Sequence, residues 1–323
     1  MSCSRWSRSL VGLCALGAAL SLRAQAPVAS KVPAIPPTLA DVAYGAHPKQ
    51  VLHFWKAESA RPAPLLFFIH GGGWVSGHRL NTLEGMLPEI LQAGISVVSV
   101  EYRFVTEAMR AKVSPPLQWP REDAARALQF VRHKAREWNI DKTRVAAAGS
   151  SAGGCTSLWL AFHDDMADPT STDPVAREST RLFCAAVDRA QTTLDPQQMK
   201  EWTSNSDYGG HAFGFMPDPQ DLKTRDTQFP QFLAARESLR PWIQRYSPIA
   251  HVTKDDPPVY LIYTTPPAMG KDDPEARHSA NFGVPLQEKL RGVGVACELV
   301  YPGAPKVKHA TMTAFFIEQL KTN

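Results

Sequence analysis

Residues 146–155 read AAAGSSAGGC, an apolar run that ends in a glycine, two serines and further very small residues. A buried strand that turns directly into a helix holds its corner residue in a strained backbone conformation, and the residues two positions away on either side must be very small. Gly149 and Gly153 occupy those two positions, which places Ser151 at the corner. Ser150 stands one place before the corner, so its side chain is expected to point away.

The rest of the chain alternates between two kinds of segment. Short continuous apolar runs, typical of strands buried on both faces of a parallel sheet, occur at residues 65–70, 95–100, 144–149, 184–187, 258–263 and 296–301. Helical spacing of apolar residues separates several of these runs, at 83–91, 124–138 and 282–290, and follows the last of them at 312–320. Strands alternating with helices predict an α/β fold: a mostly parallel, doubly wound sheet with helices on both faces.

Residues 190–256 interrupt this alternation. The segment carries many aromatic residues among prolines and polar residues, including Trp202, Tyr208, Phe213, Phe215, Phe229, Phe232 and Trp242. We expect a cap-like insertion over the top of the sheet, where such insertions often shape access to a substrate site. The alternative is a surface excursion whose aromatic side chains only bury one another.

The N-terminal residues have the order of a secretory signal peptide. Two arginines precede an apolar run at residues 10–22, and Ala24-Gln25-Ala26 follows it, so residues 1–26 are predicted to be the signal peptide, with an uncleaved anchor as the alternative. Residues 27–40 are proline-rich and predicted to be a linker, and residues 41–323 are predicted to be the folded domain. The expected location is periplasmic or secreted.

The net charge and the cysteine and histidine spacing limit which partners and cofactors are expected. Removing Arg5, Arg8 and Arg23 with the leader lowers the formal charge from +4 to +1, which leaves no basic stripe for nucleic acid. No stable membrane association is expected after cleavage. Three of the five cysteines lie beyond the leader, Cys155, Cys184 and Cys297, and their disulfide state stays open. No metal-ligand spacing is present, so neither a metal nor a cofactor is predicted.

Two motifs together resemble a known family. Gly149 to Gly153 fit the G-x-S-x-G nucleophile elbow, and HGGGW at residues 70–74, directly after a predicted strand, is similar to the oxyanion loop of hormone-sensitive-lipase-like and feruloyl-esterase-like carboxylesterases of the alpha/beta hydrolase superfamily. The resemblance extends from about residue 45 to the C-terminus and is weakest over 190–256. It implies Ser151 as nucleophile and a catalytic triad of serine, acid and histidine in that chain order.

The same resemblance implies the other site residues. The backbone N–H groups of Gly72, Gly73 and Ala152 would form the oxyanion hole, and His70 would orient the loop. His309, between the last strand and the last helix, is the expected histidine, with His278 and His251 as competitors.

The resemblance also implies an acid in the loop after the run at 258–263, so the insertion precedes the acid-bearing strand. Asp273 is preferred there, with Asp272 and Glu275 open as alternatives.

Three further segments match the family or stand out beside it. Asp123 falls where an aspartate commonly caps or braces a helix, and Glu101 stands where the family has an aspartate before Tyr-Arg. His211 and Phe213, in YGGHAFG, are suggested to border the acyl or alcohol pocket.

These features predict an exported serine carboxylesterase that acts on short-chain acyl or aromatic acyl esters, possibly on carbohydrates, through an acyl-enzyme. A peptidase or amidase of the same fold, or a hydrolase-like binding protein without catalysis, are the alternatives. The substrate would be a small-molecule or carbohydrate ester, and the oligomeric state stays open.

Overall fold

The computed structural model describes residue 1 and residues 35–81 and 85–321, and the described residues from 35 onward belong to one compact unit. The predicted signal peptide therefore lies outside the described residues, apart from Met1. No helix among the described residues has the length and apolar character needed to cross a membrane.

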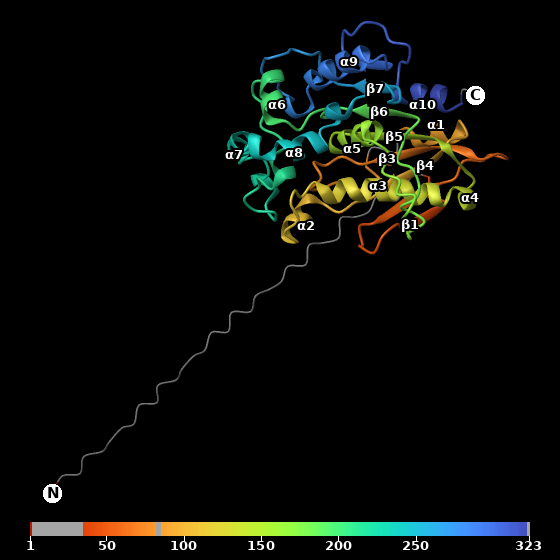
Figure 1. Cartoon of the computed structure of the whole chain (residues 1–323), viewed down its shortest axis with the longest axis horizontal. Coiled ribbons are helices and arrows are strands. Elements are labelled where there is room, and N and C mark those ends of the chain that lie inside the picture. The colour runs from red at the N-terminus through yellow and green to blue at the C-terminus, as the bar shows by residue number, and fades with distance from the viewer. Residues whose placement is uncertain (2–34, 82–84, 322–323) are drawn as a thin grey trace. The chain divides into compact units, whose positions relative to one another are not determined.

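An eight-stranded sheet forms the centre of this unit, in the order β1-β2-β4-β3-β5-β6-β7-β8 (Figure 1). The strands are β1 (Leu39–Ala43), β2 (Val51–Trp55), β3 (Ala63–Ile69), β4 (Ser96–Val100), β5 (Ile140–Ser150), β6 (Cys184–Asp188), β7 (Val259–Ile262) and β8 (Cys297–Val300). All pairs from β4 to β8 are parallel, whereas β2 is antiparallel to both β1 and β4. The sheet is the mostly parallel α/β arrangement that the alternation of segments predicts.

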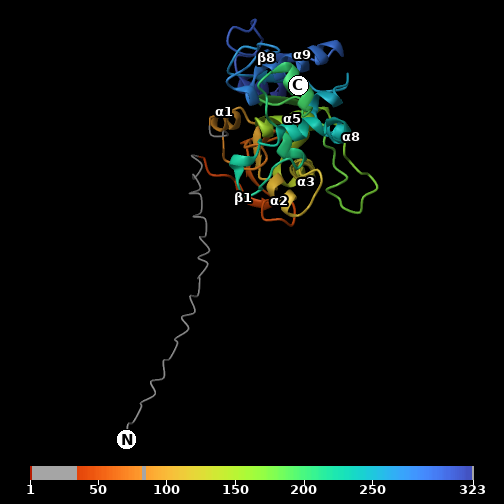
Figure 2. The same cartoon turned by 90° about the vertical axis from the view of Figure 1, so that its left-hand side faces the viewer.

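Helices cover both faces of the sheet. They are α1 (Leu87–Gln92), α2 (Val105–Arg110), α3 (Gln118–His133), α4 (Ala135–Trp138), α5 (Ala152–Phe162), α6 (Pro196–Trp202), α7 (Phe229–Ala234), α8 (Arg236–Tyr246), α9 (Gly283–Gly292) and α10 (Met312–Lys321). Helices α3, α5 and α9 pack into one apolar cluster, and α1 and α10 pack into the other. Figure 2 shows α1 and α3 on opposite sides of the strands.

Strand β3 illustrates why the central strands read as unbroken apolar runs. Leu65, Phe67 and Ile69 point into the first cluster, while Leu66 and Phe68 point into the second, and all five are buried. A residue that faces either side meets a helix, so no position tolerates a polar side chain without a partner.

The six predicted strands correspond to β3 through β8, and the predicted helical segments overlap α1, α3, α4, α9 and α10. The sequence analysis missed the edge strand β1 and its neighbour β2. Most of β1 is exposed, so it has no apolar pattern, and it begins two residues inside the predicted linker.

The segment 190–256 contains α6, α7, α8 and three short 3-10 helices, Gly210–Phe213, Leu222–Thr224 and Pro248–His251. Helices α6, α7 and α8 lie together to one side of the strands in Figure 1. The segment also contacts the loop after β3. His211 Nε2 donates a hydrogen bond to the Gly73 carbonyl, and the centre of the Tyr208 ring lies 6.4 Å from that of Trp74. The insertion thus packs over the region where β3 and β5 end.

Close packing of glycines holds the junction between β3, β5 and α5. A Cβ added to Gly149 would lie 2.5 Å from the carbonyl carbon of Gly153, and one added to Gly153 would lie 2.1 Å from the carbonyl oxygen of Ile69. Both separations are shorter than van der Waals contact, and the obstructing atoms are backbone. Only glycine fits at either position, as the sequence argument for the corner requires.

We predict that Gly153→Ala lowers the free energy of unfolding by about 3 kcal/mol, because the added methyl group forces α5 away from β3. Gly292→Ala is the matched control, since nothing lies within 4 Å of a Cβ at Gly292, which ends α9. Urea denaturation monitored by circular dichroism measures both. Equal stability of the two variants would contradict the packing argument.

Candidate active site

Ser151 occupies a strained corner between β5 and α5. Its φ is 53° and its ψ is −122°, a conformation that residues with a Cβ rarely adopt. The Ser151 N–H donates to the carbonyl of Asp188 at 2.8 Å, and its carbonyl accepts from the N–H of Cys155 at 2.8 Å. The neighbouring Ser150 hydroxyl donates to Asp188 Oδ2 at 2.9 Å. The turn therefore presents Ser151, while Ser150 is engaged elsewhere.

His278 lies against the Ser151 hydroxyl. The distance between Ser151 Oγ and His278 Nε2 is 2.9 Å, which is the hydrogen-bond contact that a serine nucleophile needs with its base. His278 ends the short 3-10 helix Ala276–His278, in the loop between β7 and α9. The structure therefore pairs Ser151 with a histidine that the sequence analysis treated as a competitor.

His309, the histidine expected at this position, lies elsewhere. Its Nδ1 is 2.5 Å from Glu298 Oε1 and its Nε2 is 3.1 Å from Glu318 Oε2. Glu298 belongs to β8 and Glu318 to α10, so two carboxylates from the last strand and the last helix flank the buried ring. The sequence analysis expected His309 to contact Ser151, and the structure corrects this expectation. His251 is also absent from the site, since its Nε2 bonds to the Arg245 carbonyl.

The sequence analysis left three candidates for the acid of the triad, and the structure places them at different distances from His278. Glu275 Oε2 lies 3.6 Å from His278 Nδ1, longer than a hydrogen bond but the shortest approach of the three candidates. Asp273, the preferred residue, is buried and its Oδ1 accepts the Glu275 N–H at 2.8 Å. Asp272 Oδ1 accepts from Ser204 Oγ at 2.5 Å. Asp273 thus shapes the loop from which Glu275 approaches His278.

The environment of His278 keeps its imidazole neutral near neutral pH. Burial lowers the pKa of His278 below 6.5, and the positive charge of Arg189 lowers it further, while Glu275 and Asp188 act in the opposite direction. A neutral imidazole can accept the serine proton, so the pKa shift favours the form that acts as a base.

The glycine loop after β3 lies beside Ser151. Gly72, Gly73 and Trp74 have φ values of 107°, 62° and 56°, and a Cβ at Gly72 would lie 2.1 Å from the Ser76 carbonyl oxygen. Among the described residues, none accepts a hydrogen bond from the N–H of Gly72, Gly73 or Ala152. Backbone donors without partners are what an oxyanion hole requires.

Side chains hold this loop in place from both ends. His70 is buried, with Nε2 3.0 Å from Glu101 Oε1 and Nδ1 2.7 Å from the Gly71 carbonyl. At the other end, Trp74 Nε1 donates to Thr156 Oγ1 in α5 at 3.1 Å. His70 therefore orients the loop, as expected, and Glu101 takes the place of the family's aspartate as its partner.

The remaining matches are structural. Asp123 receives three hydrogen bonds from the Arg103 guanidinium and one from the Arg103 N–H, so it braces the segment that follows β4. His211 and Phe213 do not border the pocket: His211 Nε2 donates to the Gly73 carbonyl at 2.9 Å, and Phe213 stacks on Phe232. The sequence analysis missed Tyr208, which does line the pocket.

The pocket over Ser151 has a volume of about 320 Å³. Its walls come from the glycine loop, the elbow, the insertion and the His278 loop: Gly71, Gly72, Gly73, Ser76, Asn81, Ser150, Ser151, Tyr208, Arg225, Arg277 and His278. None of these described residues has an aliphatic side chain. Such walls suit a small polar substrate rather than a long acyl chain.

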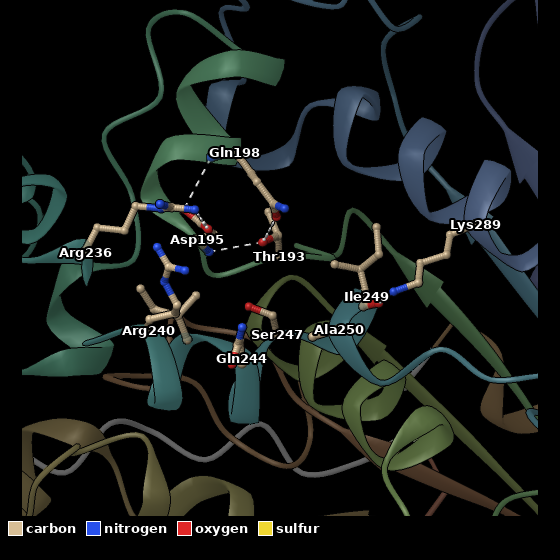
Figure 3. Close-up of a pocket in the computed structure, with 11 residues that line it drawn as sticks. Thr193, Asp195, Gln198, Arg236, Arg240, Gln244, Ser247, Ile249, Ala250 and Lys289 are labelled. Carbon is tan, nitrogen blue, oxygen red and sulfur yellow. Dashed lines mark hydrogen bonds and ion pairs between the residues drawn. The ribbon is translucent and has the colours of Figure 1, made fainter. Parts of the chain in front are cut away.

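A second cavity, of about 390 Å³, lies between α6, α8 and α9 (Figure 3). Its charged groups are already paired: Arg236 makes two hydrogen bonds to Asp195, and Lys289 Nζ donates to the Ile249 carbonyl. This cavity contains neither Ser151 nor His278.

Within the described part of the chain, Cys155, Cys184 and Cys297 are unpaired, and no group of three or more His, Cys, Asp or Glu residues is arranged to hold a metal ion. Burial raises the pKa of Cys155, which contacts the guanidinium of Arg121. Cys155 and Cys184 are buried side chains of the core, and Cys297 is partly buried against it.

The fold, the elbow and the glycine loop define the class of protein, which is the alpha/beta hydrolases. The chain belongs to the BD-FAE family, whose model matches residues 53–269.

Curated relatives of this chain carry esterase names. Esterase LipC of Mycobacterium tuberculosis is 27% identical over 69% of this chain and 49% of its own length. The probable carboxylic ester hydrolase LipM of the same organism is 24% identical over 69% of this chain and 46% of its own length. The chain thus spans about half the length of these two relatives.

Solved structures with the same fold include an acetyl ester-xyloside bifunctional hydrolase from Caldicellulosiruptor lactoaceticus, with a TM-score of 0.57, 23% identity, and coverage of 80% of this chain and 79% of that one. A carbohydrate esterase from gut microbiota has a TM-score of 0.61 and 17% identity, covering 88% of this chain and 96% of that one. Both confirm the alpha/beta hydrolase fold.

The reactivity of Ser151 toward a fluorophosphonate can show whether Glu275 or Asp273 is the acid that acts on His278. We predict that Glu275→Gln slows the modification about 10- to 100-fold, because the imidazole loses the carboxylate that stabilises its positive form. Asp273→Asn should slow it less, since Asp273 contacts the Glu275 backbone rather than His278. The rate of Ser151 modification, followed by mass spectrometry, decides between them. A larger loss in Asp273→Asn would assign the acid to Asp273.

Proposed function

We propose that the protein is a serine carboxylesterase that hydrolyses short-chain acyl esters, with carbohydrate esters among its substrates, through an acyl-enzyme. The observation that carries the proposal is the 2.9 Å contact between Ser151 Oγ and His278 Nε2 at a strained elbow beside the glycine loop. The esterase names of the relatives and the acetyl-ester and carbohydrate-esterase titles of the solved structures support it.

The geometry supports a two-step reaction. Ser151 Oγ attacks the ester carbonyl carbon while its proton passes to His278 Nε2, and the carbonyl oxygen gains a negative charge. The N–H groups of Gly72, Gly73 and Ala152 stabilise that charge, each by about 3 to 4 kcal/mol of barrier. His278 then gives the proton to the departing alcohol. Water repeats the sequence on the acyl-enzyme, which releases the acid and restores Ser151.

The same proposal includes export to the periplasm or the medium, which rests on the sequence of residues 1–26 alone. The small volume of the pocket and the lack of aliphatic side chains among its described lining residues support an acetyl group or another small acyl group rather than a fatty acyl chain. Hydrogen-bonding side chains in the walls, such as Ser76 and Asn81, also suit the hydroxyl groups of a carbohydrate on the alcohol side.

We predict that the protein hydrolyses p-nitrophenyl acetate and butyrate faster than octanoate, and that Ser151→Ala and His278→Ala each lower kcat by at least about 1,000-fold. His309→Ala is the matched control: it should change stability but leave kcat within about threefold. Initial rates at saturating substrate, with circular dichroism of each variant, measure this. Absence of hydrolysis by the folded parent, or equal losses in His278→Ala and His309→Ala, would overturn the assignment.

The acid side of the pH profile tests the base. Because His278 acts in its neutral form and its pKa lies below 6.5, kcat/KM should retain more than half of its maximum at pH 6.5 and fall at lower pH. Arg189→Gln removes a positive neighbour, so the pKa of His278 should rise and the acid limb should move to higher pH. Arg240→Gln, which removes an arginine that lines the second cavity, should not move it.

A further inference from the structure

The pocket over Ser151 presents positive charge. Arg225 and Arg277 both line it, and among its described lining residues there is no aspartate or glutamate. Both side chains are accessible, with exposed fractions of 20% for Arg225 and 41% for Arg277. The acids that pair with the two arginines, Asp226 and Asp207, do not line the pocket.

The two guanidinium groups are paired in the same way. Arg225 contacts Asp226 Oδ2 through Nε at 2.8 Å and Nη2 at 2.7 Å. Arg277 contacts Asp207 through Nε and Nη2, each at 3.3 Å, and its Nη2 also lies 3.2 Å from Asp226 Oδ2. No described residue accepts from Nη1 of either arginine. The acids hold both groups in position and leave one nitrogen of each unpaired.

A third donor lies beside them. Tyr208 lines the same pocket and is almost fully buried, and its hydroxyl has no hydrogen-bond partner among the described residues. A Cβ built on Gly73 would lie 2.8 Å from Arg225 Nη1 and 3.6 Å from Tyr208 Oη. Both donors therefore meet at the loop that would bind the oxyanion. A buried hydroxyl without a partner carries a free-energy cost that a ligand acceptor removes.

We propose that this pocket selects esters that carry an anionic group, a carboxylate a few bonds from the scissile carbonyl, and that Arg225, Arg277 and Tyr208 are the residues that bind it. The proposal deepens the esterase assignment and rests on it. A carboxylate oxygen accepts from both Nη1 nitrogens and from the Tyr208 hydroxyl, and charge-assisted bonds of this kind are about twice as strong as neutral ones. Guanidinium groups are suited to carboxylates because their donors form a rigid fork.

The substrate test uses pairs that differ in charge but not in shape. On the alcohol side, 4-acetoxybenzoate is compared with 4-acetoxybenzamide; on the acyl side, monomethyl glutarate is compared with methyl 4-carbamoylbutanoate. We expect kcat/KM to favour the anion by about tenfold or more in at least one pair, and the pair that shows it identifies the side. The preference should shrink at high salt. Hydrolysis without charge preference in either pair would overturn this inference but leave the esterase intact, whereas absence of all hydrolysis would refute the esterase.

Variants assign the preference to residues. Arg225→Gln and Arg277→Gln should each reduce the anion-to-amide ratio at least threefold, mainly through KM, and Tyr208→Phe should reduce it less. Arg225→Lys keeps the charge and should retain part of the preference, which separates loss of charge from loss of folding. Arg240→Gln removes the same charge from α8 beside the other cavity (Figure 3) and should leave the ratio unchanged. An equal effect of Arg240→Gln would show that the preference comes from the overall charge of the protein rather than from this pocket, and would overturn the proposal.

A binding measurement is independent of turnover. Calorimetric titration of Ser151→Ala with the two esters of the pair that shows the preference should give a Kd at least tenfold lower for the anion, and Arg225→Gln in the same background should abolish the difference. Equal affinity for the two probes would contradict the proposal even if esters are hydrolysed.

Discussion

The strained turn at Ser151 is the constraint on which the site depends. A positive φ at a residue with a Cβ persists only where the surroundings over-determine it, and here the surroundings are backbone. Gly153 packs against the Ile69 carbonyl at the end of β3, and Gly149 packs against Gly153. The strand that carries the serine and the strand that precedes the glycine loop are therefore joined at a contact that admits no side chain. This contact sets how the loop and the serine lie relative to one another.

Much of this could be predicted from the sequence, because the signals are local. Short, largely apolar runs identify β3 to β8, most clearly the central strands that are buried on both faces. The glycine spacing identifies Ser151 without knowledge of the fold. The edge strand β1 could not be predicted in this way, because exposed residues leave no apolar period. β1 forms a strand because its backbone pairs with that of β2, not because of its own composition.

The histidine could not be placed from its order in the chain. His309 stands where the family's order predicts it, but two carboxylates, Glu298 on β8 and Glu318 on α10, hold its ring between the last strand and the last helix. The loop after β7 is long enough to bring His278 to the serine instead. A sequence signal did exist, since Glu275 and His278 are three residues apart in one loop, but only the tertiary structure shows that the loop returns to Ser151.

One carboxylate, Asp226, connects the proposed charge selectivity to the oxyanion loop. Burial would raise the pKa of Asp226, but its contacts with His211 and Arg225 outweigh this and lower the pKa to about 2, so it stays ionised. It positions Arg225 and Arg277, and it lies 3.3 Å from His211, whose other nitrogen donates to the Gly73 carbonyl. The insertion therefore does more than cover the pocket. Because the same acid orients the arginines and supports the histidine that holds Gly73, the walls that would select a substrate and the amides that would stabilise its transition state form a single packed unit.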